Sequence, residues 1–120
     1  MGHHKELLAY KKGYELAMKI FIIAKRFPAE EKYSLTDQIR RSSRSVCTNV
    51  AEAFRRKRYR DYFISKLNDA ETENAETEVW LDFSRDCNYI NQAEYEELVS
   101  MNTEVGKLIW YMINNPEKFM

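Results

Sequence analysis

The chain has 120 residues, of which 44% are hydrophobic and 32% charged, and 19 Lys and Arg side chains balance 19 Asp and Glu side chains. This length suits one shared hydrophobic core, so we expect a single domain over residues 1–120. No stretch approaches the ~20 consecutive apolar residues of a membrane span, and the first residues lack the apolar segment of a signal peptide. These features predict a cytoplasmic protein with no membrane partner.

The charges are unevenly distributed along the chain. Residues 38–60 contain one anion and eight cations, which are Arg40, Arg41, Arg44, Arg55, Arg56, Lys57, Arg58 and Arg60. Residues 61–98 reverse this balance, with eleven Asp and Glu side chains against two cations. The neutral sum therefore hides a strong charge dipole.

The first helix is expected over residues 5–26. Its apolar positions repeat at spacings of three and four, and they are Leu7, Tyr10, Tyr14, Ala17, Phe21 and Ala24. Pro28 should end this helix, because the residue before a proline is driven out of the helical region. The whole chain has only three Gly and two Pro, which favours an all-α protein.

The second helix is expected over residues 34–55. Ser34 is placed to cap it, and Asp37 would favour the free amides of its first turn. An apolar stripe with two small serines follows, formed by Leu35, Ile39, Ser42, Ser43, Val46, Val50 and Phe54. An unbroken helix from Leu35 to Cys87 would be roughly 80 Å long at 1.5 Å per residue, too long for a compact domain. We therefore place a turn within residues 55–60.

The third helix is expected over residues 59–87. A regular alternation of fours and threes marks its buried seam, which is Phe63, Leu67, Ala70, Asn74, Thr77, Leu81 and Ser84. The fourth helix is expected over residues 91–114, since Asn91 and Glu94 have the spacing of a capping box, with Ile90 and Tyr95 as its hydrophobic staple. Its apolar stripe consists of Tyr95, Leu98, Asn102, Val105, Ile109 and Met112.

Four helices with short connections predict an antiparallel up-down four-helix bundle. Cys47 and Cys87 are too few for a disulfide scaffold, so we expect both to be reduced and half-buried. The aromatic side chains of the later half should lie mostly in the core, and they are Trp80, Phe83, Tyr89, Trp110, Tyr111 and Phe119. Their surplus favours an oligomer over a monomer.

Three segments resemble one known family. Residues 38–52, QIRRSSRSVCTNVAE, are similar to the second-helix signature of the small bacterial proteins first noticed as open reading frames within 23S ribosomal RNA intervening sequences. Arg26-Phe27-Pro28 resembles the end of that family's first helix, and residues 69–81 resemble its third helix more loosely. Two positions depart from the pattern, because the family often has proline where Cys47 stands and glycine where Ala53 stands.

The resemblance implies a four-helix bundle, commonly assembled as a homopentameric ring. A related branch, the accessory variability determinant of diversity-generating retroelements, is a basic pentamer that partners a reverse transcriptase and binds nucleic acid. The resemblance thus implies a ring-forming oligomer whose partners are copies of itself, RNA or DNA, and another protein.

The basic block is the best candidate site. Several arginines on adjacent helical turns can neutralise consecutive phosphates and release their counterions. Arg40, Arg41 and Arg44 would lie on the second helix, and residues 55–60 would form the corner after it. Tyr59 and Tyr62 are interleaved with these cations and are suited to stack on unpaired bases. We therefore predict a nucleic-acid-binding accessory protein.

A structural alternative stays open. In a head-to-tail ring, the basic corner of one subunit would dock on the acidic third helix of the next, which makes the protein an interaction scaffold. Asn49 and Glu52, three residues apart beside the apolar stripe, are placed either to face one another across a turn or to reach a neighbouring helix. Either arrangement fits a hydrogen-bonded element that fixes how helices or subunits meet.

Catalysis and metal binding are not expected. The two histidines, His3 and His4, lie at the N-terminus, so the sequence supports neither a nucleophile–base pair nor the Glu-x-x-His motif of di-iron bundles. It also lacks the glycine-rich loops that cradle phosphates. We predict no enzyme activity, no metal and no cofactor.

Overall fold

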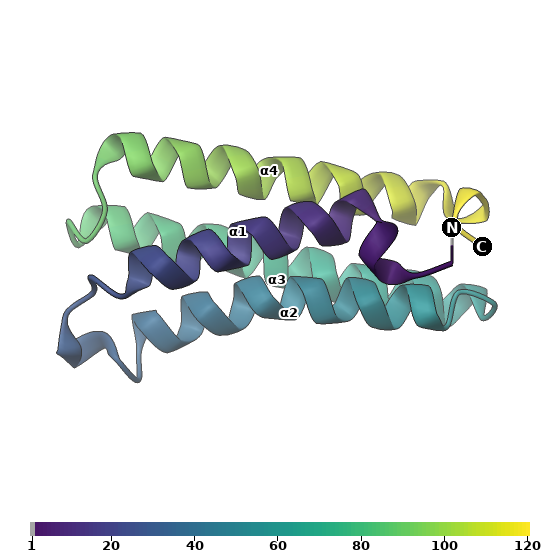
Figure 1. Ribbon diagram of the computed structural model, residues 1–120, viewed down its shortest axis with the longest axis horizontal. Coiled ribbons are helices and arrows are strands. Elements are labelled where there is room, and N and C mark those ends of the chain that lie inside the picture. Colours follow the sequence, from purple (N-terminus) through teal and green to yellow (C-terminus); the bar gives the residue numbers. More distant parts are fainter. Residues whose placement is uncertain (1) are drawn as a thin grey trace.

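The computed structural model describes residues 2–120 and contains four long helices and three short 3-10 helices (Figure 1). The long helices are α1 (Leu8–Ala24), α2 (Leu35–Arg55), α3 (Arg60–Asp86) and α4 (Gln92–Asn114). The short ones are η1 (His4–Glu6), η2 (Ala29–Glu31) and η3 (Pro116–Lys118). No strand occurs in the described residues, so the all-α prediction is confirmed for them.

The four helices lie side by side along the longest dimension of the molecule, 44 Å (Figure 1). The α1–α2 and α3–α4 connections lie at one end of the bundle. The α2–α3 connection lies at the other end, together with both chain termini. Each helix packs against two others, α1 and α3 each against both α2 and α4. One end of the bundle therefore gathers three segments that are distant in sequence.

The predicted buried stripes of α2, α3 and α4 are confirmed almost residue by residue. All seven positions of the α2 stripe are buried, and the seams of α3 and α4 depart only at Asn74 and Tyr95, which are half-buried. Burial on this scale supplies the dominant favourable contribution to folding.

The predicted stripe of the first helix is confirmed at Leu7, Ala17 and Ala24 and is wrong at Tyr14 and Phe21. The buried positions of α1 are Ala9, Gly13, Leu16, Ala17, Ile20 and Ala24. Tyr14 is 53% exposed and Phe21 is half-buried, although both were predicted to face the core. The reason is that α1 is apolar on more than one side, since Met18 and Ile22 are also exposed. Periodicity identifies a buried face only when the opposite face is polar.

A polar layer crosses the middle of the core. Asn74 Nδ2 donates to the backbone oxygen and to Oδ1 of Asn102, at 3.0 and 2.9 Å, and Asn102 Nδ2 donates to the backbone oxygen of Asn74 at 3.0 Å. Thr77 Oγ1 donates to Ser42 Oγ at 2.9 Å. These bonds join α3 to α4 and to α2. Because buried polar groups are costly without partners, the layer favours this register of the helices.

The predicted capping box is confirmed, and Ser34 occupies the predicted N-cap position of α2. Asn91 Oδ1 accepts from the Glu94 backbone amide, and the Glu94 carboxylate accepts from the amide of Asn91. Ser34 makes no side-chain capping bond. The carboxylate of Glu31, contributed by η2, accepts from the Leu35 amide instead, at 3.2 Å. That carboxylate satisfies a free amide of the first turn of α2.

The ends of the helices differ by a few residues from the predicted ones, mainly in α1. Its predicted range, 5–26, overlaps a separate 3-10 turn, η1, that precedes Leu8. After Ala24, the backbone amides of residues 25–27 donate to oxygens three residues earlier instead of four, so the α-helix has ended. The predicted ranges 34–55, 59–87 and 91–114 each extend one residue beyond the helix at one or both ends.

Two expectations about side-chain burial need correction. Both cysteines are free, but Cys47 is buried and Cys87 is exposed. The later aromatic residues are not mainly core: Phe83, Trp110 and Tyr111 are exposed, and Trp80, Tyr89 and Phe119 are half-buried. Aliphatic and small residues, together with Phe54 and Phe63, fill the seams, which leaves these later rings at their margins. Within residues 2–120, no helix is both long and apolar enough to cross a membrane.

Candidate nucleic-acid interface

The connection between α2 and α3 forms because apolar residues on both sides hold it against the core. Phe54 is 3% exposed at the end of α2 and Phe63 is 0% exposed in the first turn of α3. The connection Arg56–Tyr59 is closed by backbone hydrogen bonds, including one from the Tyr59 amide to the Arg56 oxygen at 2.9 Å. With both flanks anchored, most polar side chains between them project into solvent. We call Arg55 to Arg60 together with Tyr62 the basic corner.

Aromatic rings interleave with the cations of the basic corner. The guanidinium carbon of Arg56 lies 6.0 Å from the ring centroid of Tyr59 and 5.7 Å from that of Tyr62. Arg58 lies 4.9 Å from the centroid of Tyr59. Tyr59 and Tyr62 are 49% and 39% exposed, so each ring retains free surface. Cation–π contacts of this kind hold arginines near rings without neutralising their charge.

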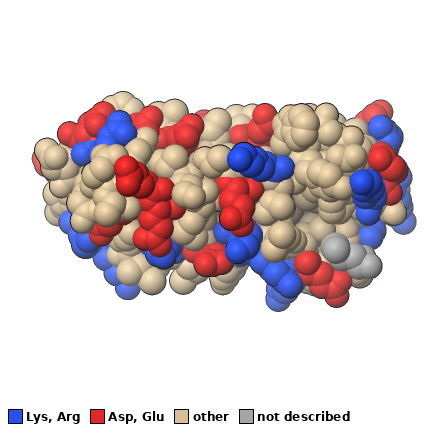
Figure 2. Space-filling model, turned by 90° about the horizontal axis from the view of Figure 1, so that it is seen from above, with Lys and Arg blue, Asp and Glu red and all other residues tan. Residues whose placement is uncertain are grey.

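The arginines of the basic corner lack acidic partners. Within residues 2–120, no ion pair involves Arg55, Arg56, Arg58 or Arg60. All four are exposed. Clustered like charges repel one another, and they raise the local concentration of an anionic ligand. In Figure 2, several blue side chains lie at the right-hand end with red ones among them, where Figure 1 places the α2–α3 connection and both termini.

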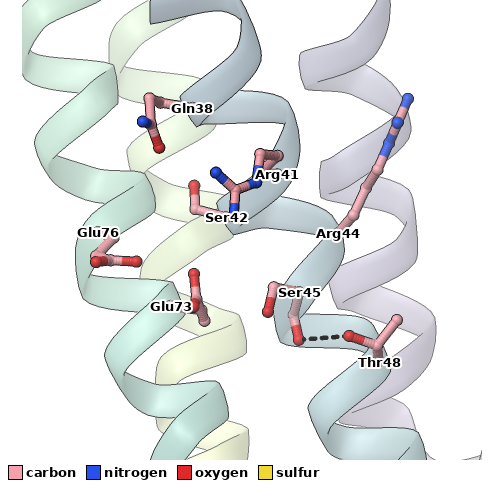
Figure 3. Close-up of a pocket in the computed structure, with 8 residues that line it drawn as sticks. All are labelled: Gln38, Arg41, Ser42, Arg44, Ser45, Thr48, Glu73 and Glu76. Carbon is pink, nitrogen blue, oxygen red and sulfur yellow. Dashed lines mark hydrogen bonds between the residues drawn. The ribbon is translucent and has the colours of Figure 1, made fainter. Parts of the chain in front are cut away.

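Three of the arginines in α2, Arg40, Arg41 and Arg44, have different environments. Arg40 is half-buried, donates from Nη2 to the Phe21 oxygen at 3.0 Å, and lies 4.6 Å from the Phe21 ring centroid. Arg44 is exposed and lies 5.4 Å from the same centroid. Arg41 is exposed and turns the other way, toward α3 (Figure 3). Arg40 is thus held by α1, which leaves Arg41 and Arg44 as the more accessible cations of these three.

A polar hollow of about 500 Å³ lies between α2 and α3 (Figure 3). Its lining residues are Gln38, Arg41, Ser42, Arg44, Ser45, Thr48, Glu73 and Glu76. Burial, together with a hydrogen bond to Glu76 and the charge of that carboxylate, raises the pKa of Glu73, and Arg41 opposes the shift. Two neighbouring carboxyl groups repel each other when both are ionised. The pair therefore favours sharing a proton or binding another cation.

Asn49 and Glu52 bond to different partners. Asn49 Nδ2 donates to the backbone oxygen and to Oγ of Ser45, at 3.0 and 3.2 Å, within α2. Glu52 accepts the ammonium of Lys66 in α3, at 3.0 Å. Both are bound within the subunit. The Glu52–Lys66 pair crosses from α2 to α3 directly behind the basic corner.

Reasoning from sequence missed Phe21 and the Glu73–Glu76 pair. Phe21 matched the apolar spacing of α1, so nothing local indicated that its ring would face arginines of α2. Glu73 and Glu76 stood among many acids, and only the packing of α2 on α3 distinguishes them. In the part of the chain that the structure describes, no cluster of three or more His, Cys, Asp or Glu side chains could hold a metal ion.

Comparisons with known proteins agree with this architecture. The family model described as 23S rRNA-intervening sequence protein matches residues 5–111. The chain is also similar to a protein of unknown function from the S23 ribosomal protein family of Bacteroides thetaiotaomicron VPI-5482, whose crystal structure was determined at 1.70 Å resolution. The two share 34% identity with a TM-score of 0.82, and the match covers 89% of this chain and 96% of the other. A search of curated proteins found no match.

Proposed function

This chain belongs to the 23S rRNA-intervening sequence protein family, and we propose that it is a cytoplasmic, non-enzymatic accessory protein that binds RNA or DNA through its basic corner. The family resemblance adds the proposal of a homopentameric ring built as an up-down bundle, which would present several corners to one nucleic acid. Binding at several corners would raise the overall affinity well above that of a single one.

The observation that carries the proposal is that, within residues 2–120, the basic corner combines arginines outside any ion pair with exposed tyrosine rings. Arg55, Arg58 and Arg60 offer charge to phosphates without first breaking an ion pair. Tyr59 and Tyr62 offer ring surface to bases, and stacking of this kind tolerates any sequence. The proposed binding is therefore sequence-tolerant and strongly dependent on salt.

Salt dependence tests the proposal. The association constant for an RNA or DNA oligonucleotide can be measured by fluorescence anisotropy. Its logarithm should fall linearly with the logarithm of the salt concentration. Replacing Arg58 and Arg60 with Ala should lower the magnitude of that slope by about 1.4 for a single strand, at about 0.7 per phosphate contact. Lys25→Ala with Lys32→Ala removes the same charge at the other end of the bundle, and its slope should match wild type. Absence of binding at low salt would contradict the proposal.

A second candidate function rests on the polar hollow. Burial and the neighbouring Glu76 carboxylate raise the pKa of Glu73, although Arg41 opposes the shift, and a further cation would favour the ionised form of this pair. In a ring, an arginine from the basic corner of a neighbouring subunit would supply it, and the protein would act as an interaction scaffold. The basic corner would then be consumed by assembly.

Charge changes at the two surfaces separate the candidates. Reversing Arg55, Arg56 and Arg58 to Glu should dissociate the assembly in light scattering if the corner docks on the hollow. Glu73→Gln with Glu76→Gln should weaken the same assembly. If both variants keep the wild-type mass while the reversal variant loses nucleic-acid binding, the scaffold function is rejected and the binding function stands.

A further inference from the structure

A second hollow lies near the start of the chain, which Figure 1 places at the same end of the bundle as the basic corner. It measures about 480 Å³ and is lined by Lys5, Tyr10, Lys11 and Tyr14. The ring centroids of Tyr10 and Tyr14 lie 6.0 Å apart, with their planes inclined by 34°. Tyr14 is 53% exposed, and both lysines are exposed. We call these four residues the N-terminal hollow.

The N-terminal hollow combines the two features that an unpaired nucleotide requires. Tyr14 presents free ring surface beside Tyr10, and rings of this kind stack on bases. Lys5 and Lys11 supply ammonium groups for the attached phosphate. Its volume lies within the ~300–1,000 Å³ range of small-molecule sites. The acid beside it, Glu6, accepts the Gly2 amide at 3.1 Å, and no ion pair within residues 2–120 occupies either lysine.

His4 connects the N-terminal hollow to the basic corner. Its ring packs edge-on against Tyr10, with centroids 4.9 Å apart, and it belongs to η1, which packs against both α1 and α2. Burial, His3 and the nearby charge of Arg55 together lower the pKa of His4. His4 Nδ1 is buried and has no hydrogen-bond partner among residues 2–120. Rings and cations thus continue from Arg55 across η1 onto α1.

We propose that the N-terminal hollow binds an unpaired nucleotide of the same strand that contacts the basic corner, so that the protein selects single-stranded RNA or DNA over duplex. This inference rests on the proposed nucleic-acid binding and specifies its ligand. In a duplex, both faces of each base are covered by its neighbours in the stack. A single strand can turn a base into the hollow while its backbone follows the cations.

Oligonucleotide length tests the inference. Oligouridine and oligothymidine series, from a trinucleotide upward, would be titrated into the full chain at low salt, with a duplex of matched length as a further arm. A trinucleotide occupies one site, whereas longer strands reach both. Wild-type affinity should therefore rise sharply once a strand spans the corner and the hollow, and it should exceed the affinity for duplex.

The diagnostic variant carries Lys11→Ala and Tyr14→Ala. Long strands should bind on the order of tenfold to hundredfold more weakly, as expected for one lost stacked base and one lost phosphate contact, whereas a trinucleotide should bind almost as before. Tyr14→Phe keeps the ring and should retain wild-type affinity, which also guards against a misfolded double variant.

The matched control carries Lys32→Ala and Tyr33→Ala at the opposite end of the bundle. There, the Lys32 ammonium lies 5.4 Å from the ring centroid of Tyr33, which is 83% exposed. This control should bind every strand as wild type does.

Three outcomes would overturn the inference. Equal affinity for duplex and single strand would remove the selection. If the Lys11, Tyr14 variant keeps the wild-type dependence of affinity on strand length, the hollow does not take part in binding. In that case, weakened binding by the Arg58, Arg60 variant would still support the proposed function of the basic corner. Absence of any binding by the wild-type chain at low salt would overturn both proposals together.

Discussion

Replacing Asn102 with Ala should destabilise the bundle by about 2 kcal/mol. Asn102 is 3% exposed, and its side chain takes part in two hydrogen bonds with Asn74, one as donor and one as acceptor. Losing two buried hydrogen bonds costs about 1–1.5 kcal/mol each. The higher helix propensity of Ala returns about 0.6 kcal/mol. The remaining bond, from Asn74 to the backbone oxygen of Asn102, does not depend on the side chain of residue 102.

Denaturation by urea or guanidinium, followed by circular dichroism, measures this change in the free energy of unfolding. The transition midpoint should shift with an unchanged slope, which shows that stability alone has changed. Asn114→Ala is the matched control, since Asn114 is exposed on the same helix and bonds within its own turn. A loss below about 0.5 kcal/mol for Asn102→Ala would refute the assignment of stability to the Asn74–Asn102 bonds.

The other predictions concern positions with equally specific surroundings. Gly106→Ala should lower the melting temperature despite a propensity gain of about 1 kcal/mol, because its Cβ would lie 2.7 Å from Asn74 Oδ1; a rise would show that this side chain moves freely. Asn91→Ala should cost about 1 kcal/mol by removing the capping box, and an unchanged denaturation midpoint would contradict this. At pH 8, Ellman's reagent should label exposed Cys87 quickly in the native protein and Cys47 only in denaturant, since burial raises the pKa of Cys47 to about 11. Labelling of both thiols in the native protein would refute the burial of Cys47. The stabilisation linked to the neutral thiol of Cys47 is complete below the unfolded pKa, about 8.5–9, and should be lost as the pH rises through about 11.

The sequence predicted the helices and most of the core because the signals are local. In α2, α3 and α4, polar residues separate the apolar ones, so spacing alone identified the buried faces. The capping box of α4 was equally readable, since Asn91 and Glu94 are three residues apart and each side chain accepts from the other's backbone amide. Local signals failed at Tyr14 and Phe21 of α1, where exposed Met18 and Ile22 hide the phase of the buried stripe.

The candidate site divides in the same way. The concentration of cations in residues 55–60 is a property of the sequence, and a corner between two anchored helices exposes most of them. Which cations stay accessible is a tertiary property. Arg40 is held by a backbone oxygen of α1, whereas Arg41 faces carboxylates of α3.

The N-terminal hollow shows the same limit, because η1 brings His4 beside α1 and within electrostatic range of Arg55 in α2. The sequence by itself determined four amphipathic helices, their caps in part, and a strong charge dipole, since each depends on residues within a few turns of one another. Only the tertiary structure decided which charges are paired and which rings lie beside them. Those contacts depend on how each helix is rotated and shifted against its neighbours, and residues far apart in the chain set that arrangement.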